Sequence, residues 1–277
     1  ATRKNFTVGT RHLGLVAGDL DKDGKVDLVV VNQTPNTVSI LRNTSTLGVI
    51  NFVSVLTLTG FNVPQIPALD DFDGDGNLDL AVSNITGNSV SFFRNTFATT
   101  GTISFTTSGI SIATGTTPVG ISGGDMNGDG KVDLVVTLFG SNSVSVFRNT
   151  STGVGSISFA LSNYAAGTNP ENLVVGDMNA DGKPDVAAAN YNNTSISLFR
   201  NIATVAAPVI SSFNPTSGPI STSVTLTGQN FNPTPNQNVV FFGATQATVT
   251  NATSTTLTVT VPSGANYQYI SVTNLAN

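Results

Sequence analysis

Several residue types that commonly carry catalysis or covalent cross-links are missing from the sequence. Its 277 residues include no cysteine, no tryptophan and one histidine, His12. Without cysteine the chain neither depends on an oxidising compartment nor excludes one. We expect His12 to lie in a turn before the first strand, with a solvated or packing role. Thiol chemistry is therefore excluded, and histidine chemistry is reduced to one residue.

Charge and long apolar runs are also scarce. Only 10% of the residues are charged, the formal net charge is -5, and the 11 basic residues form no cluster. A surface that follows a phosphate backbone needs clustered Lys and Arg, so we expect no nucleic-acid partner. No apolar run reaches the roughly 18 residues that a spanning helix needs, so we expect no membrane insertion. Gly, Ser, Thr, Asn and Val dominate instead, which is typical of a soluble, strand-rich protein.

One nine-residue stretch occurs four times. DLDKDGKVD (19–27) recurs as DFDGDGNLD (71–79), DMNGDGKVD (125–133) and DMNADGKPD (177–185). The starts of these stretches are 52, 54 and 52 residues apart. Each stretch is followed by an Arg-Asn pair, whose arginine lies 23 residues after the first aspartate: Arg42, Arg94, Arg148 and Arg200. Constant spacing inside the unit predicts one supersecondary module repeated four times.

Each unit is predicted to form four short strands. An apolar strand ends in a segment such as LVAGD, the aspartate loop follows, and VDLVVVN or an equivalent forms the second strand. A polar turn leads to a third strand such as VSIL, and a fourth follows the Arg-Asn pair. This pattern predicts an all-β fold of β-propeller blades, as a closed four-bladed ring or part of a larger one. A β-sandwich with decorated turns is the alternative. The fourth unit lacks its outer strand, and we expect residues 3–9 (RKNFTVG) to complete that blade.

The aspartate loops have the ligand pattern of a hard cation. Oxygen ligands at positions 1, 3, 5, 7 and 9, with glycine at position 6, suit Ca²⁺, which takes six to eight oxygens. At position 7 a lysine offers only its backbone carbonyl, because an ammonium group has no free lone pair. The sequence predicts four Ca²⁺ sites with these ligands: Asp19, Asp21, Asp23, Lys25 and Asp27; Asp71, Asp73, Asp75, Asn77 and Asp79; Asp125, Asn127, Asp129, Lys131 and Asp133; Asp177, Asn179, Asp181, Lys183 and Asp185.

Other interpretations of the loops fit less well. An EF-hand needs a bidentate glutamate at position 12, where the first two loops have Val30 and Val82. Mg²⁺ prefers one or two carboxylates and keeps its water. Metal-free Asx turns would leave several carboxylates close together and mutually repelling. Asn127 and Asn179 remove a charge, so we expect the third and fourth sites to bind Ca²⁺ more weakly than the first two. The recurrent arginines are predicted to hold loop carboxylates or turn carbonyls.

The DxDxDGxxDL pattern with its Arg-Asn strand ends resembles the FG-GAP and VCBS repeats of integrin-α-like propellers over residues 1–206. This resemblance implies calcium loops on one face of the ring, a ligand on the opposite face, and an extracellular, secreted or cell-surface protein. Such propellers commonly have seven blades, and four are visible in this sequence.

The composition changes after Ala206, where prolines appear and the aspartate loops stop. Strands of five to eight residues between Pro, Gly and Asn turns predict a small sandwich over residues 207–277. The motifs of this segment look like an IPT/TIG immunoglobulin-like domain: F-x-P-x-x-G at Phe213, Pro215 and Gly218, G-x-N-F from Gly228 to Phe231, and V-x-F-G from Val240 to Gly243. We expect the domain to be truncated before its last strand. The open sheet edge would then allow self-association.

Little material remains for catalysis. Of 16 acidic residues, 14 lie in the four loops, and only Asp70 and Glu171 lie elsewhere. We therefore expect no enzyme activity, but a calcium-stabilised extracellular recognition or adhesion module that binds a protein or glycan opposite the loops. Phe139 and Tyr191 lie in the turns of that face. The alternatives are a structural subunit of an extracellular filament or stalk, and a carbohydrate-binding accessory region of a polysaccharide-degrading protein.

Overall fold

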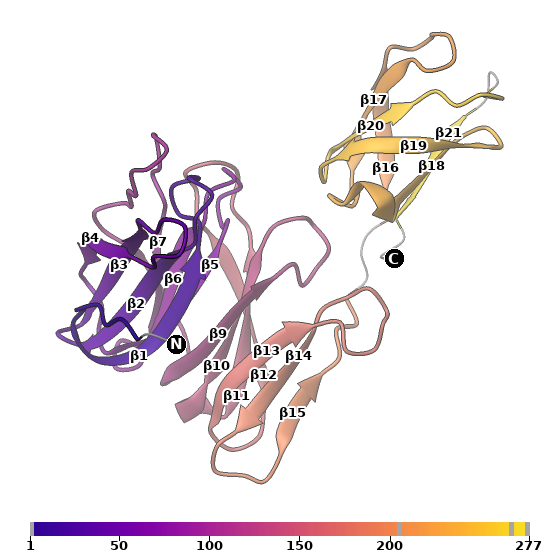
Figure 1. Ribbon diagram of the computed structural model, residues 1–277. Coiled ribbons are helices and arrows are strands. Elements are labelled where there is room, and N and C mark those ends of the chain that lie inside the picture. Colours follow the sequence, from indigo (N-terminus) through magenta and orange to yellow (C-terminus); the bar gives the residue numbers. More distant parts are fainter. Residues whose placement is uncertain (1–2, 204–206, 266–268, 275–277) are drawn as a thin grey trace. The chain divides into compact units, whose positions relative to one another are not determined.

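The computed structural model describes residues 3–203, 207–265 and 269–274, and within these ranges the regular structure is β-strand apart from two three-residue 3-10 turns (Figure 1). No helix in the described ranges combines the length and apolar character that a bilayer span requires. The predicted domain boundary lies between residues 206 and 207, and Ala206 is outside the described residues. Tyr267 and Gln268 also lie outside the described residues.

Fifteen strands precede the C-terminal segment and form four separate sheets (Figure 1). Their bounds are β1 Thr10–Gly18, β2 Asp27–Thr34, β3 Thr37–Asn43, β4 Phe52–Leu58, β5 Pro64–Asp70, β6 Asp79–Asn84, β7 Ser89–Phe93, β8 Ile110–Ala113, β9 Pro118–Gly124, β10 Asp133–Leu138, β11 Ser143–Asn149, β12 Phe159–Ala165, β13 Pro170–Gly176, β14 Asp185–Asn190 and β15 Ile196–Phe199. Three sheets have four strands in chain order, and the fourth contains β13, β14 and β15. We call these sheets blades one to four. The all-β, blade-type fold predicted from the repeat is confirmed.

The chain divides into two compact units. The first comprises the described residues of Ala1–Gly124, Val132–Val175 and Val186–Phe199, and therefore most of the four blades. The second comprises those of Asp125–Lys131, Gly176–Asp185 and Arg200–Asn277.

The middle strands of blades two and three are buried on both faces. Every residue of β6 and of β10 is buried. A strand covered on only one face alternates between apolar and polar residues, whereas one covered on both faces is apolar nearly throughout. Segments such as DLVVTL of β10 are apolar runs because a neighbouring blade covers each side.

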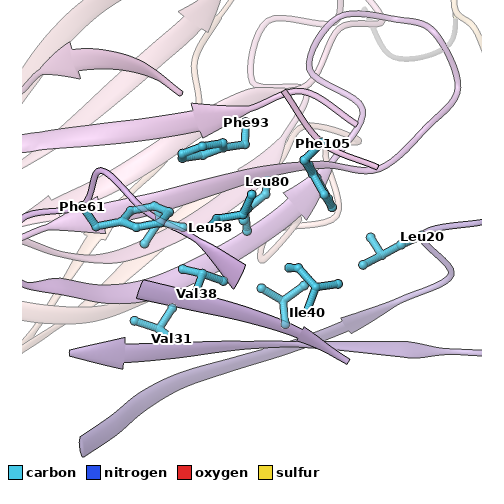
Figure 2. Close-up of a cluster of buried hydrophobic side chains, with 11 residues drawn as sticks. Leu20, Val31, Val38, Ile40, Leu58, Phe61, Leu80, Phe93 and Phe105 are labelled. Carbon is cyan, nitrogen blue, oxygen red and sulfur yellow. The ribbon is translucent and has the colours of Figure 1, made fainter. Parts of the chain in front are cut away.

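Two apolar clusters lie between successive blades. The first joins Val38 and Ile40 of β3 to Leu80 of β6 and Phe93 of β7, all within 1% of complete burial (Figure 2). The second joins side chains of blade two to those of blade three, including Phe92 and Phe147. Complete burial of each large apolar side chain contributes roughly 1.5–3 kcal/mol. The contact between blades is therefore the main apolar core of this unit.

The N-terminal segment does not complete the fourth blade as the sequence predicts. Lys4 Nζ donates to the backbone oxygen of Ile50 at 3.1 Å, and the Phe6 ring packs edge-on against Phe52 of β4 at 5.5 Å. These contacts place the segment on blade one, where an aromatic partner is available. His12, expected in a turn, lies within β1.

The C-terminal segment forms one six-stranded arrangement in the order β16-β17-β20-β19-β18-β21, with β16 and β21 as its outer strands. The bounds are β16 Val209–Asn214, β17 Ser223–Gln229, β18 Asn238–Phe242, β19 Thr245–Ala252, β20 Thr256–Thr260 and β21 Ile270–Asn274. In β17 the burial alternates strictly, with Val224, Leu226 and Gly228 inside. Val224 and Leu226 pack with Phe231, Val240 and Leu257 in a separate core. A small sandwich-like domain is thus confirmed for this segment.

Candidate metal centres

The four aspartate loops occupy equivalent places in the blades. Each loop follows the inner strand of its blade, and its ninth residue is the first residue of the second strand. Its glycine at position 6 has a positive φ in every repeat: 82° at Gly24, 81° at Gly76, 79° at Gly130 and 81° at Gly182. A residue with a Cβ adopts this left-handed backbone only with strain. The predicted sharp turn at position 6 is therefore present in all four loops.

Three carboxylates converge in each of the first two loops. One group consists of Asp19, Asp21 and Asp27, and the other of Asp71, Asp73 and Asp79. In each group one oxygen from each residue lies within 4.8 Å of the others, and two of the three residues are buried. Three negative oxygens at this separation repel one another strongly away from bulk water. Both groups are thus arranged to bind a metal ion.

Burial makes the charged form of these carboxylates costly. It raises the pKa of Asp79 from 3.8 to about 7, against the opposing hydrogen bond from the Asn95 backbone. It also raises the pKa of Asp27 and of Asp125 above the ordinary value. A nearby positive charge stabilises the ionised form of a buried carboxylate. The electrostatics of the loops therefore favour a bound cation.

The backbone of each loop supports the first and ninth positions. Asp71 accepts hydrogen bonds from the N–H groups of Gly74, Asp75 and Gly76 at 2.7 to 3.1 Å. In the fourth loop the equivalent bond from Gly182 lowers the pKa of Asp177. Asp79 accepts from the backbone of Phe72 at 3.1 Å. These bonds orient the carboxylates and leave the loop preformed.

Arginines hold the third-position carboxylate where that residue is an aspartate. Arg42 binds Asp21 through Nε and Asp23 through Nη2, the latter at 2.7 Å. Arg94 Nε lies 2.7 Å from Asp73 Oδ2. These two pairs confirm the prediction that the recurrent arginines hold loop carboxylates.

The pairing weakens where asparagine replaces that aspartate. Arg200 is 70% exposed and lies 3.8 Å from Asp181, and Arg148 is exposed. The loops with Asn127 and Asn179 therefore carry both fewer carboxylates and a looser arginine. Their amides instead donate to the fifth-position aspartates, at 3.1 Å in the third loop and 3.0 Å in the fourth.

The donor set of the second loop fits a hard cation. The amide oxygen of Asn77, at position 7, is buried and has no hydrogen-bond partner among the residues that the structure describes. A buried acceptor without a donor is destabilising, and a cation would satisfy it. Carboxylate and amide oxygens, with no nitrogen or sulfur ligand, are those that Ca²⁺ takes. The position-7 lysines leave their side chains outside this set: Lys183 Nζ, for example, donates to the backbone oxygen of Ala203 at 2.6 Å.

The asparagine of each Arg-Asn pair is a functional residue that sequence reasoning missed. Asn95 Nδ2 donates to the backbone oxygen of Leu20 in the preceding loop at 2.9 Å. Asn149 makes the same bond to Phe72 at 2.9 Å, and Asn201 to Met126 at 2.7 Å. The signal in the sequence is that asparagine follows the arginine in every repeat. In blades two, three and four the asparagine therefore links its loop to the loop before it.

The strand ends opposite the loops bring Phe139 and Tyr191 together, 6.1 Å apart between ring centroids. Asn169 connects their backbones: its Nδ2 donates to Phe139 O at 2.9 Å, and its carbonyl accepts from Tyr191 N at 2.9 Å. Asn192 Nδ2 donates to the Asn169 side chain at 2.7 Å. Tyr191 is 66% exposed. The result is an exposed aromatic pair bordered by amides.

Comparison with known families finds two families in this chain. The FG-GAP-like repeat matches three overlapping segments, residues 19–82, 71–136 and 125–188. The IPT/TIG domain matches residues 208–274. The repeat matches, from residue 19 to residue 188, contain all four aspartate loops, and the match to the second family begins after the last blade.

Two solved structures that resemble this chain share little sequence with it. One is a crystal structure of BBS1N in complex with ARL6DN, with 12% identity and a TM-score of 0.45, covering 94% of this chain and 95% of that one. Another is a functionally unknown protein from Desulfotomaculum acetoxidans DSM 771, with 12% identity and a TM-score of 0.39, covering 97% and 91%. A search of curated proteins found no match.

Proposed function

Because the chain belongs to the FG-GAP-like repeat family and carries an IPT/TIG domain, we propose that it is a non-catalytic, calcium-stabilised recognition module that works outside the cell. FG-GAP and TIG domains are typical of extracellular adhesion and recognition proteins, and neither is a catalytic family. We further propose that Ca²⁺ stabilises the blades, that the loop residues hold it, and that the face opposite the loops binds a ligand.

The observation that carries the proposal is the convergence of three carboxylates in each of the first two loops. Ca²⁺ would supply the positive charge there, and the aspartates at positions 1, 3 and 9 would hold it, with Asn77 as a further ligand in the second loop. The third and fourth loops repeat the turn with an amide at position 3, so we extend the proposal to four sites. Binding would link the end of each inner strand to the start of the next strand, which couples its free energy to folding.

Thermal unfolding in Ca²⁺, in Mg²⁺ and in excess chelator tests the role of the metal. A site held at a hundred times its dissociation constant adds about 2.7 kcal/mol of stability. For a chain of this size that corresponds to roughly 5–10 °C in Tm. We expect Ca²⁺ to raise Tm by at least this amount and Mg²⁺ to raise it less. An identical melting curve in Ca²⁺ and in chelator would contradict the proposal.

A matched pair of variants assigns the effect to the loops. Asp79→Asn removes a carboxylate from the second group and should reduce the calcium-dependent shift. Asp70→Asn removes a neighbouring carboxyl that is outside the group, and it should leave most of the shift intact. Burial raises the pKa of both carboxyls, to about 6 for Asp70 and about 7 for Asp79, so the two variants each replace a carboxyl whose charged form is disfavoured. Equal loss in both variants would point to a general effect of charge.

The aromatic pair opposite the loops is the proposed ligand surface. Tyr191 presents a large apolar ring with a polar hydroxyl, and Asn192 borders it with an amide. Such a surface suits a sugar ring, which has apolar C–H faces and hydroxyl edges, or a peptide with an exposed ring. A glycan array tests the first ligand class. Tyr191→Ala should abolish a positive signal, whereas Tyr269→Ala, which removes a 95% exposed tyrosine from the C-terminal unit, should retain it.

A further inference from the structure

Blades one and two each bury one apolar face against the blade that follows. We call this the forward face and define it by the residues 11 and 13 positions after the ninth loop residue. In blade one these are Val38 and Ile40, both 0% exposed, and in blade two Val90 and Phe92, at 0% and 1%. The forward face is therefore an interface that the chain builds repeatedly.

Blade four carries the same apolar face, and no blade in the described part of the chain covers it. The equivalent residues are Ile196 and Leu198 of β15, which are 63% and 64% exposed. They lie opposite Ala189 and Ala187 of β14. Val174 on β13 is 60% exposed, whereas Ala68, its equivalent in blade two, is 8% exposed. An apolar surface built across three strands is thus left open to solvent.

Blade one carries the complementary half of this interface. We call the side of a blade that meets the preceding blade its rear face. In blade three Val119 and Ile121 of the inner strand lie on the rear face, and each is 8% exposed. Their equivalents in blade one, Leu13 and Leu15, are 46% and 64% exposed. The N-terminal segment contacts the outer strand of this blade through Phe6 and leaves both leucines accessible.

A polar contact of the blade interface is also open on blade one. Asn95 and Asn149 each donate one amide bond within their own blade and a second to the loop of the preceding blade. Asn43, the equivalent in blade one, makes the bond within its own blade, to Val26 at 2.8 Å. Within the described residues, Asn43 Nδ2 makes no second bond of the kind that Asn95 and Asn149 make to a preceding loop.

We propose that a second copy of this chain covers these surfaces, with the forward face of blade four in one copy docking on the rear face of blade one in the next. The two surfaces are the halves of a contact that the chain already makes between its own blades, and both are exposed in one chain. The occupant that best matches each surface is therefore another copy of the same repeat. A head-to-tail contact of this kind closes into a ring or continues as a filament.

Sedimentation velocity over a range of protein concentrations tests this proposal with two blocked chains. Ile196→Asp with Leu198→Asp blocks the forward face of blade four, and Leu15→Asp blocks the rear face of blade one. We expect the wild-type chain to assemble as its concentration rises. Each blocked chain alone should remain monomeric, because docking would bury an unpaired carboxylate and weaken the contact at least about a hundredfold. An equimolar mixture should form a species of two chains and no larger one, since each partner supplies one intact face.

Controls separate this contact from other routes of assembly. Leu47→Asp changes a fully exposed loop leucine outside both faces and should assemble like the wild type. Melting curves confirm that the blocked chains are folded, and Leu198→Ser is the milder variant if the double aspartate chain is not. A wild-type chain that stays monomeric would overturn the proposal. So would blocked chains that assemble normally, as they would through the edge of the immunoglobulin-like domain, or a mixture that stays monomeric.

Discussion

Asn95 Nδ2 donates a 2.9 Å hydrogen bond to the backbone oxygen of Leu20, 75 residues earlier in the chain. The same side chain donates to Leu78 O of its own loop at 3.2 Å, and its backbone N–H donates to Asp79 at 2.8 Å. One asparagine therefore ties together two successive aspartate loops. Because the bond recurs at Asn149 and Asn201, the loops form a continuous hydrogen-bonded series rather than independent turns.

Replacing this asparagine should destabilise the repeat array more than replacing its equivalent in blade one. Asn95→Ala leaves the buried oxygen of Leu20 without a donor, and a lost bond of this type costs about 1–3 kcal/mol. Asn43→Ala removes the same bonds within its own blade but none to a preceding blade. We expect urea denaturation to show a larger loss for Asn95→Ala by at least about 1 kcal/mol. Equal losses would mean that the bond between blades adds nothing measurable.

The stability of the calcium-free protein should fall as the pH rises towards neutrality. The pKa of Asp79 is about 7 in the folded chain against an ordinary value of 3.8, because burial disfavours its charged form. A carboxyl with a raised folded pKa contributes stability that is complete below its unfolded pKa and is lost as the pH rises through the folded value. Between about pH 4 and pH 7 the free energy of unfolding in chelator should therefore decrease. Asp79→Asn should reduce this slope, and an unchanged slope would exclude Asp79 as its origin.

Calcium should reverse that dependence. Ca²⁺ binds the ionised carboxylates, so binding releases protons and strengthens as the pH rises. The difference in Tm between calcium and chelator should therefore grow from pH 5 to pH 7.5. Differential scanning calorimetry at matched ionic strength measures this difference. A constant difference across that range would argue against the buried aspartates as ligands.

The first two loops should bind calcium more tightly than the last two. An amide replaces the third-position carboxylate at Asn127 and Asn179, which removes one negative charge next to the ion. At the effective dielectric of a partly buried site this is worth more than 1.4 kcal/mol, or about tenfold in affinity. Isothermal titration of Asp73→Asn should show one site weakened by at least about that factor, and Asn127→Asp should strengthen one. Equal affinities in all four loops would contradict the prediction.

Truncating equivalent apolar side chains should reduce the free energy of unfolding by different amounts, depending on whether a following blade covers them. Phe92 is 1% exposed between blades two and three, and Phe92→Ala should reduce the free energy of unfolding by about 3–5 kcal/mol. Leu198, at the same position of blade four, is 64% exposed, and Leu198→Ala should cost less than about 1 kcal/mol in dilute protein. Chemical denaturation of the two variants compares them directly. A large loss of unfolding free energy for Leu198→Ala would mean that another part of the same chain covers Leu198.

Much of the fold follows from periodic features that are local in the chain. The nine-residue loops, their glycines and the Arg-Asn pairs predict the blades, their boundaries and the strand order, because each blade consists of neighbouring segments joined by short turns. The aspartates of a loop lie within nine residues of one another, so their convergence is also a local property. The pairing of Arg42 with Asp21 was predictable for the same reason, since both belong to one blade.

Contacts between blades were not predictable in this way. Asn95 and Leu20 are 75 residues apart, and no feature of either residue alone identifies its partner. The position of the N-terminal segment also depends on competition between surfaces. The sequence placed it on blade four, whereas Phe6 packs on Phe52 of blade one.

By itself the sequence determined the repeat, the strand content, the oxygen-rich loops and the change of composition after Ala206, because these depend on spacing and side-chain chemistry within one module. Only the tertiary structure decided which carboxylates are buried, which asparagines link the loops and which blade faces remain uncovered. Those properties depend on how modules distant in the chain stack on one another, and stacking energy is spread over many weak apolar contacts that leave no local signature in the sequence.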